Sequence, residues 1–228
     1  MTDPPFKPKA IIFDLLTALL NSWDIWDAVI PPSERYISST PGTTWRKQYL
    51  NITFACGAYK PYEDLVHQAA KDVGLSDEAP KALLARYDET GPWPEVPGVL
   101  GRLREMGYRL GVVTNCSDEL GRRTVERVEK LVRQETGNSS WAFDAIVTAE
   151  ESGYYKPQKK PYHDTLEKLS VSAEEALFVA GSAFDIEGAT DAGMRVVWNN
   201  HVGLERQGAA MPLREGKELG EALRDFLG

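Results

Sequence analysis

Cysteine is scarce in this chain, and its apolar runs are short. The two cysteines among 228 residues, Cys56 and Cys116, fit no paired metal-binding spacing and make no disulfide framework for a chain of this size. We expect both to be free thiols in a reducing compartment. No run approaches the roughly 20 apolar residues of a membrane span, and residues 1–9 lack the apolar segment of a secretory signal. The sequence predicts a soluble, cytoplasmic protein with no membrane partner.

Positive charge is also in deficit. Lysine and arginine number 26 against 34 aspartate and glutamate, which gives a net charge of −8. An acidic protein repels nucleic acid at long range, so we expect no nucleic-acid partner. A local basic pocket could still bind a small anion. The hydrophobic share of 42% supplies a core for one domain, or for one domain that carries an insertion.

Short apolar runs alternate with longer amphipathic stretches along most of the chain. The runs cover residues 10–13, 110–113, 176–180 and 195–198, with a weaker fifth at 143–147. Runs of this length without polar alternation are typical of strands buried on both faces. Residues 120–133 and 161–169 carry apolar side chains at helical spacing. This order predicts an α/β fold, with a three-layer Rossmann-like core built on a parallel sheet.

Residues 21–92 break the alternation. They contain no run typical of a buried strand, and we expect helices at 23–28, 45–56, 62–73 and 79–87. Pro31-Pro32 and Pro41-Gly42 interrupt the first part of this segment. We therefore predict a helical insertion, residues 21–92, after the first strand of a core formed by residues 1–20 and 93–228.

Polar residues follow successive apolar runs. Asp14 comes after the first, Thr114 and Asn115 after the second, Lys156 after the fifth and Asp185 after the third. Because the carboxyl ends of parallel strands meet at one edge of a sheet, these side chains should converge there. Each alone is more simply explained as a turn, a helix cap or a solvated loop. Together they predict a nucleophilic carboxylate, a lysine that keeps it ionised, groups that orient an anionic substrate, and a second carboxylate that positions water or a metal.

These residues form four motifs in a fixed order. They are Ile11-Ile12-Phe13-Asp14-Leu15-Leu16-Thr17, Val112-Val113-Thr114-Asn115, Tyr155-Lys156-Pro157 with Tyr162, and Gly181-Ser182-Ala183-Phe184-Asp185. The order resembles the haloacid dehalogenase superfamily over nearly the whole chain. The resemblance implies that Asp14 is the nucleophile and that the helical insertion is a cap.

Two positions separate this chain from the phosphatases of that superfamily. Phosphatases carry a second Asp two residues after the nucleophile, which protonates the leaving oxygen, and this position is Leu16 here. Ser182 stands where they usually hold a further acid. A halide departs as an anion and needs no proton. The pattern therefore favours the 2-haloacid dehalogenase branch, which uses no metal.

The segment Thr44-Trp45-Arg46-Lys47 resembles the Trp-Arg cap segment of the 2-haloacid dehalogenases. On the residues alone, Arg46 would be an exposed helix arginine. The resemblance implies instead that Arg46 takes the halide, that Lys156 and Tyr162 serve the nucleophile, and that Asp185 orients the hydrolytic water. The same resemblance places six further residues at the substrate: Thr114, Asn115, Leu16, Thr17, Ser182 and Phe184.

Three functions stay open. The leading hypothesis is (S)-2-haloacid dehalogenation, in which Asp14 displaces a halide and water cleaves the resulting ester to a 2-hydroxy acid, with no cofactor. The second is a Mg²⁺-dependent phosphate-ester hydrolase. The third is a binding protein with weakened turnover, which Leu16, Ala18 and Ala180 favour because they replace side chains that line the pocket or position water in the family. The expected partner is a small anionic molecule, and the resemblance also makes a homodimer plausible.

Overall fold

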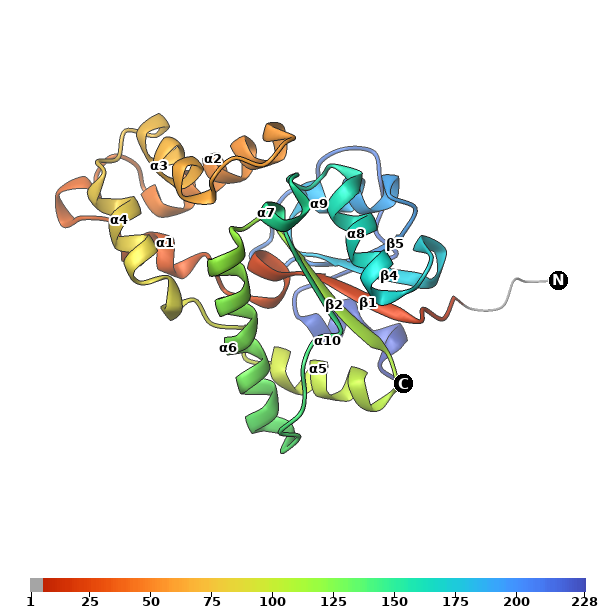
Figure 1. Cartoon of the computed structure of the whole chain (residues 1–228). Helices are drawn as coiled ribbons and strands as arrows, with labels where there is room; N and C mark the ends of the chain where they lie inside the picture. Colours follow the sequence, from red (N-terminus) through yellow and green to blue (C-terminus); the bar gives the residue numbers. More distant parts are fainter. Residues whose placement is uncertain (1–5) are drawn as a thin grey trace.

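A parallel β-sheet forms the centre of the molecule (Figure 1), and its strands lie in the order β3-β2-β1-β4-β5-β6. The structure is a computed structural model that describes residues 6–228, so residues 1–5 of the predicted core lie outside the described residues. The strands are β1 (Ala10–Asp14), β2 (Arg109–Thr114), β3 (Ala145–Thr148), β4 (Ala176–Ala180), β5 (Arg195–Asn199) and β6 (Arg214–Gly216). The four main apolar runs and the weaker fifth all form strands, which confirms the predicted α/β class.

The sixth strand was not expected from the sequence. β6 is only three residues long, is polar, and pairs with β5 at the edge of the sheet. β6 is an edge strand, so only one of its two hydrogen-bonding edges has a neighbouring strand, and it carries no apolar run. Its position depends on β5 rather than on its own composition.

Helices cover both faces of the sheet, so the core has three layers. One side is formed by α5 (Val96–Glu105), α6 (Asp118–Thr136) and α10 (Leu219–Ala222), the other by α8 (Lys159–Leu169) and α9 (Ala183–Asp191), with α7 (Ala149–Ser152) between β3 and α8. Short 3₁₀ turns occupy Ala173–Glu175 and Arg224–Phe226. Successive residues of β1 point to opposite faces of the sheet. Ile11 packs in the hydrophobic cluster that contains α5 and α6, and Ile12 packs in the cluster that contains α8 and α9.

A helical cap between β1 and α5 lies beside the sheet (Figure 1). It contains α1 (Asp24–Ala28), α2 (Pro41–Cys56), α3 (Tyr62–Asp72) and α4 (Glu78–Ala85), with 3₁₀ turns at Pro32–Glu34 and Tyr87–Glu89. Trp26 and Trp45 pack at a ring separation of 4.4 Å, and Trp45 Nε1 donates to the carbonyl of Val66 at 3.0 Å. No helix within residues 6–228 has the length and apolar character needed to cross a membrane.

Helix α2 begins earlier than predicted. The sequence placed its start at residue 45, with Pro41-Gly42 as a break, whereas the helix starts at Pro41 itself. Proline is well suited to the first helical position, because its fixed φ fits the helix and its missing N–H would have no partner there. Gly42 is needed at the next position, since a Cβ would lie 2.4 Å from the backbone nitrogen of Asp27 in α1.

The two chain segments that join cap and core run side by side. Leu20 and Pro92 form an antiparallel bridge, Asn21 N donates to Gly91 O at 2.9 Å, and Trp93 N donates to Leu19 O at 3.0 Å. Domain boundaries at 20/21 and 92/93, predicted from composition, remain our proposal, and this pairing supports them.

A tight turn follows β1 and fixes the geometry of its last residue. Leu15–Leu19 form one π-helical turn, and Asn199 at the end of β5 donates to Ala18 O at 2.8 Å. Gly181, directly after β4, lies against this turn. A Cβ at Gly181 would fall 2.1 Å from Ala18 N and 2.2 Å from Thr17 C, both backbone atoms. The turn after β1 and the loop after β4 therefore fit together only with glycine at position 181.

Substituting Gly181→Ala should displace the turn after β1. We expect the free energy of unfolding to fall by about 2 kcal/mol, as overpacking against a fixed neighbour does, and hydrolytic activity to fall with it. Gly98→Ala is the matched control, because nothing lies within 4 Å of its Cβ position in α5 and alanine should gain about 0.5 kcal/mol there. Urea unfolding measures both changes. Equal stability of the two variants would contradict the close fit at Gly181.

Candidate active site

Asp14 ends β1 and caps the turn that follows it. Its Oδ2 accepts from Thr17 N at 2.7 Å, Thr17 Oγ1 at 2.7 Å and Ala18 N at 3.2 Å. Its Oδ1 accepts from Lys156 Nζ at 2.7 Å. Burial would raise the pKa of Asp14, but the charge of Lys156 and the hydrogen bonds from Lys156 and Thr17 outweigh burial and lower the pKa below its ordinary value. The carboxylate, which is only 4% exposed, is therefore held in its ionised form.

Lys156 joins the two carboxylates of the site. Its Nζ lies 2.7 Å from Asp14 Oδ1 and 3.0 Å from Asp185 Oδ1, and all three side chains are buried. Burial lowers the pKa of Lys156, but the charges of Asp14 and Asp185 outweigh it, so the pKa is raised. The ammonium group thus stays charged without access to water.

Asp185 lies in the first turn of α9 and has a different environment from Asp14. Tyr162 in α8 donates to its Oδ1 at 3.1 Å, and Ser182 donates to its Oδ2 at 3.3 Å. Burial raises the pKa of Asp185 to about 6, Lys156 opposes this rise, and the charge of Asp14 adds to it. The pKa of Asp14 is therefore lowered and that of Asp185 is raised, which suits one carboxylate to attack and the other to exchange a proton.

Thr114 ends β2 and Asn115 follows it directly, and the two side chains differ in their hydrogen bonding. Asn115 Oδ1 accepts from Lys156 N at 2.7 Å, and its Nδ2 donates to Lys156 O at 3.1 Å. The Asn115 amide therefore fixes the backbone that carries the lysine. The Thr114 hydroxyl is buried and has no hydrogen-bond partner among the described residues. A bound molecule with an acceptor atom would satisfy it.

Arg46 projects from cap helix α2 and is only 1% exposed. Its guanidinium carbon lies 5.0 Å from the ring centroid of Trp26, 5.2 Å from that of Tyr49 and 5.8 Å from that of Trp23. Nη2 donates to Ser22 Oγ at 3.0 Å, while Nε and Nη1 have no partner within residues 6–228. No carboxylate in that range forms an ion pair with it. A buried cation with two unused donors is costly unless an anion binds there.

The donor set does not fit a divalent cation. Both oxygens of Asp14 accept from protein donors, and Lys156 lies against Asp14 and Asp185 where a cation would have to bind. Mg²⁺ demands about six oxygen ligands in octahedral geometry. Across residues 6–228, no group of three or more His, Cys, Asp or Glu side chains is arranged to hold a metal ion.

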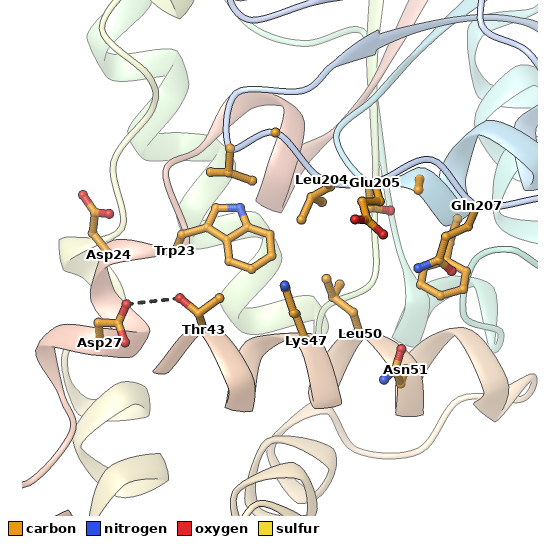
Figure 2. A pocket seen from close by; sticks show the side chains of 15 residues that line it. Trp23, Asp24, Asp27, Thr43, Lys47, Leu50, Asn51, Leu204, Glu205 and Gln207 are labelled. Carbon is orange, nitrogen blue, oxygen red and sulfur yellow. Dashed lines mark hydrogen bonds between the residues drawn. The ribbon is translucent and has the colours of Figure 1, made fainter. Parts of the chain in front are cut away.

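A cavity of about 730 Å³ opens between cap and core next to these groups (Figure 2). Trp23 and Lys47 line its cap side, and Glu205 lies opposite them. Ser182 and Phe184, both predicted at the substrate, line its core side, and Phe184 stacks on Phe54 of α2. The other predicted groups do not line this cavity and are buried at the end of β1 and in the turn after it, at the end of β2, between α7 and α8, and in α2, α8 and α9: Asp14, Leu16, Thr17, Thr114, Asn115, Lys156, Tyr162, Asp185 and Arg46.

The sequence did not single out two residues that join the cap to the site. Tyr49 donates its hydroxyl to Asn115 O at 2.9 Å, and Ser22 accepts from Arg46. Tyr49 lies three residues after Arg46, so helical spacing could have placed both on one face of α2. Ser22 offers no such signal in the sequence. It lies in the first of the two hinge segments, which are the segments that join cap and core, and its contact with Arg46 depends on how helix α2 packs against that segment.

Known proteins similar to this chain include both dehalogenases and a phosphatase. (S)-2-haloacid dehalogenase H-109 of Pseudomonas putida is 27% identical, covering 96% of this chain and 97% of its own. Glyceraldehyde 3-phosphate phosphatase of Pyrococcus abyssi is 38% identical, but over 46% of this chain and 42% of its own. The structure of L-2-haloacid dehalogenase from Xanthobacter autotrophicus with chloropropionic acid covalently bound superposes with a TM-score of 0.72 at 21% identity, over 96% of this chain and 98% of that one. The model of the family described as haloacid dehalogenase-like hydrolase matches residues 11–199, and the chain belongs to that family.

Proposed function

We propose that this protein hydrolyses the carbon–halogen bond of a small (S)-2-haloacid, with Asp14 as the covalent nucleophile. The observation that carries the proposal is the buried Arg46 guanidinium, with two unused N–H donors and no carboxylate partner within residues 6–228. A leaving halide is an anion of the size and charge that such a group stabilises. The similarity to dehalogenases over nearly the full chain supports the same reaction.

In the first step, Asp14 attacks the halogen-bearing carbon of the substrate. Its Oδ2 already accepts three hydrogen bonds, whereas Oδ1 accepts one from Lys156, so Oδ1 keeps the more available lone pair. The new C–O bond forms as the C–halogen bond breaks, and the halide leaves with the bonding electron pair. Nε and Nη1 of Arg46 receive the halide, and the free Thr114 hydroxyl donates to the substrate carboxylate.

In the second step, water hydrolyses the ester. Asp185 accepts a proton from water as the water oxygen attacks the ester carbonyl carbon. The bond from that carbon to the substrate oxygen then breaks, Asp185 returns its proton to this oxygen to give the 2-hydroxy acid, and the regenerated Asp14 carboxyl loses its proton to solvent. The net reaction consumes one water and releases one halide and one proton. The raised pKa of Asp185, about 6, places it close to neutral pH, where a general base is most effective.

We also propose that the reaction uses no metal and no organic cofactor. The buried site requires that cap and core separate to admit substrate and then close over it, which excludes bulk water. A homodimer and a cytoplasmic location, both expected from the sequence, stay predictions that sedimentation and cell fractionation would test.

Chloride release from (S)-2-chloropropionate tests the nucleophile and the leaving group together. We expect release that EDTA does not change and that Asp14→Asn abolishes, because an amide cannot form the ester. Asp191→Asn, at the exposed end of α9, is the matched control and should keep full activity. If the wild type releases no chloride, phosphate esters with Mg²⁺ would be assayed next, and phosphate release would establish the metal-dependent hydrolase instead.

Arg46→Met should separate activity from stability. We expect kcat/KM for the haloacid to fall by about 10²–10³, as on removal of a donor aimed at developing charge. We expect the melting temperature to hold or rise, because the substitution removes a buried charge that has no carboxylate partner within residues 6–228 and keeps a similar apolar volume. Calorimetry and halide assays measure the two effects. A large loss of stability with unchanged turnover would assign Arg46 to the packing of the cap.

The reaction should slow at acid pH because of Asp185. Its pKa of about 6 means that the carboxyl is ionised above pH 6 and protonated below it, and only the ionised form accepts a proton from water. Asp14, whose pKa is lowered, stays ionised through the same range. We therefore expect kcat to fall about tenfold per pH unit below about pH 6. Asp185→Asn should remove this inflection and accumulate the Asp14 ester, which mass spectrometry would detect. A wild-type profile that is flat from pH 7 to pH 5 would exclude this role.

A further inference from the structure

Ser22 lies where the core chain passes into the cap, and its side chain is buried. Its Oγ accepts a hydrogen bond from Arg46 Nη2 at 3.0 Å. The same hydroxyl donates a hydrogen bond to the backbone carbonyl of Leu16. The donor and an acceptor site of the hydroxyl are thus both in use, which fixes its rotation.

These two contacts link the cap arginine to the turn that holds the nucleophile. Leu16 belongs to the π-helical turn after β1, and the backbone N–H groups of Thr17 and Ala18 in that turn bind Asp14. The path from Arg46 to Asp14 therefore passes through one side chain, that of Ser22, and one turn of backbone. The hydroxyl that accepts from Arg46 is therefore itself hydrogen-bonded to the turn that holds Asp14.

The aromatic rings around Arg46 do not fix its orientation. A ring face attracts the guanidinium charge, but it does not select which N–H points in which direction. The hydrogen bond to Ser22 does select one, because it occupies Nη2 and leaves Nε and Nη1 as the pair without partners. The position of the cation is therefore set by Trp26 and Tyr49, and its direction by Ser22.

We propose that Ser22 is a positioning residue. It directs Nε and Nη1 of Arg46 toward the leaving halide and fixes their position relative to Asp14. The inference rests on the proposed dehalogenase function. It adds a residue at the hinge, outside the four motifs and outside the cap Trp-Arg segment, whose hydroxyl couples departure of the halide to attack by the nucleophile.

The test compares two leaving groups in Ser22→Ala. Chloride is the poorer leaving group, so its departure depends more on stabilisation by Arg46 than that of bromide does. We expect kcat for (S)-2-chloropropionate to fall about tenfold and kcat for (S)-2-bromopropionate to fall less, so that the bromide-to-chloride ratio of kcat rises at least threefold. Ser22→Thr, which keeps the hydroxyl, should bring the ratio back toward the wild-type value.

Thr90→Val is the matched control. Thr90 lies in the second hinge segment, is buried, and has a hydroxyl with no hydrogen-bond partner among the described residues. We expect its removal to leave the ratio unchanged. Ser22→Cys, which fills nearly the same space but hydrogen-bonds weakly, replaces the alanine variant if that variant does not fold.

The outcomes separate the role of Ser22 from the reaction itself. An equal fall for both substrates in Ser22→Ala, with the ratio unchanged, would show a merely structural residue and overturn the proposal. If the wild type releases neither halide, this result contradicts the proposed dehalogenase reaction and not the proposed role of Ser22 in orienting Arg46. Bromide titration followed by tryptophan fluorescence then decides, since Trp23 and Trp26 adjoin Arg46. Weaker bromide binding in Ser22→Ala would support the aimed guanidinium, and unchanged binding would exclude it.

Discussion

The buried ammonium of Lys156, shared by Asp14 and Asp185, is the interaction on which the site depends. Taking three charged groups out of water is expensive, and removing one member of such a group leaves the others uncompensated. The sheet brings the three charged groups together, so that they compensate one another. Asp14 ends β1, and α9, which carries Asp185, follows β4. Asn115, directly after β2, fixes the backbone of Lys156 through both the oxygen and the nitrogen of its side-chain amide. Each element therefore holds part of one electrostatic unit.

The charge balance of this unit explains why the cap must contribute a cation. Two carboxylates and one ammonium leave a net negative charge, which by itself would repel an anionic substrate. Arg46 brings the second positive charge, and it is buried without a carboxylate of its own within residues 6–228. In the proposed reaction, the core supplies the nucleophile and the carboxylate that activates water, and the cap supplies the cation that stabilises the leaving anion. The proposed site therefore needs residues of both the core and the cap.

Much of this arrangement could be predicted from the sequence, for a physical reason. Short apolar runs place Asp14, Lys156 and Asp185 near successive strand ends, and the topology of a parallel sheet then brings such residues to one edge. The burial of Arg46 could not be predicted from helical pattern, since it lies in a segment whose polar and apolar residues do not separate cleanly, and family resemblance alone pointed to it. Ser22 and strand β6 depend on contacts between distant segments, which local sequence does not encode. The start of α2 at Pro41 was missed because proline both breaks and begins helices.

The contact between Ser22 and Leu16 also bears on which chemistry this member of the family performs. A metal-dependent hydrolase at this edge of the sheet would need oxygen ligands that protein donors leave free. Here the Leu16 carbonyl accepts from Ser22, Asp14 accepts from Lys156 and the turn, and Leu16 offers no acidic side chain to protonate an oxygen leaving group. Converting the site to phosphate-ester hydrolysis would require at least a new acid and the release of these acceptors. The proposed departure of a halide needs neither change, because the halide leaves as an anion and the Arg46 guanidinium is already buried, with Nε and Nη1 unpartnered within residues 6–228. The Ser22 hydroxyl, which we propose orients Arg46, also occupies a backbone carbonyl of the nucleophile turn, and this supports the proposed reaction without a metal.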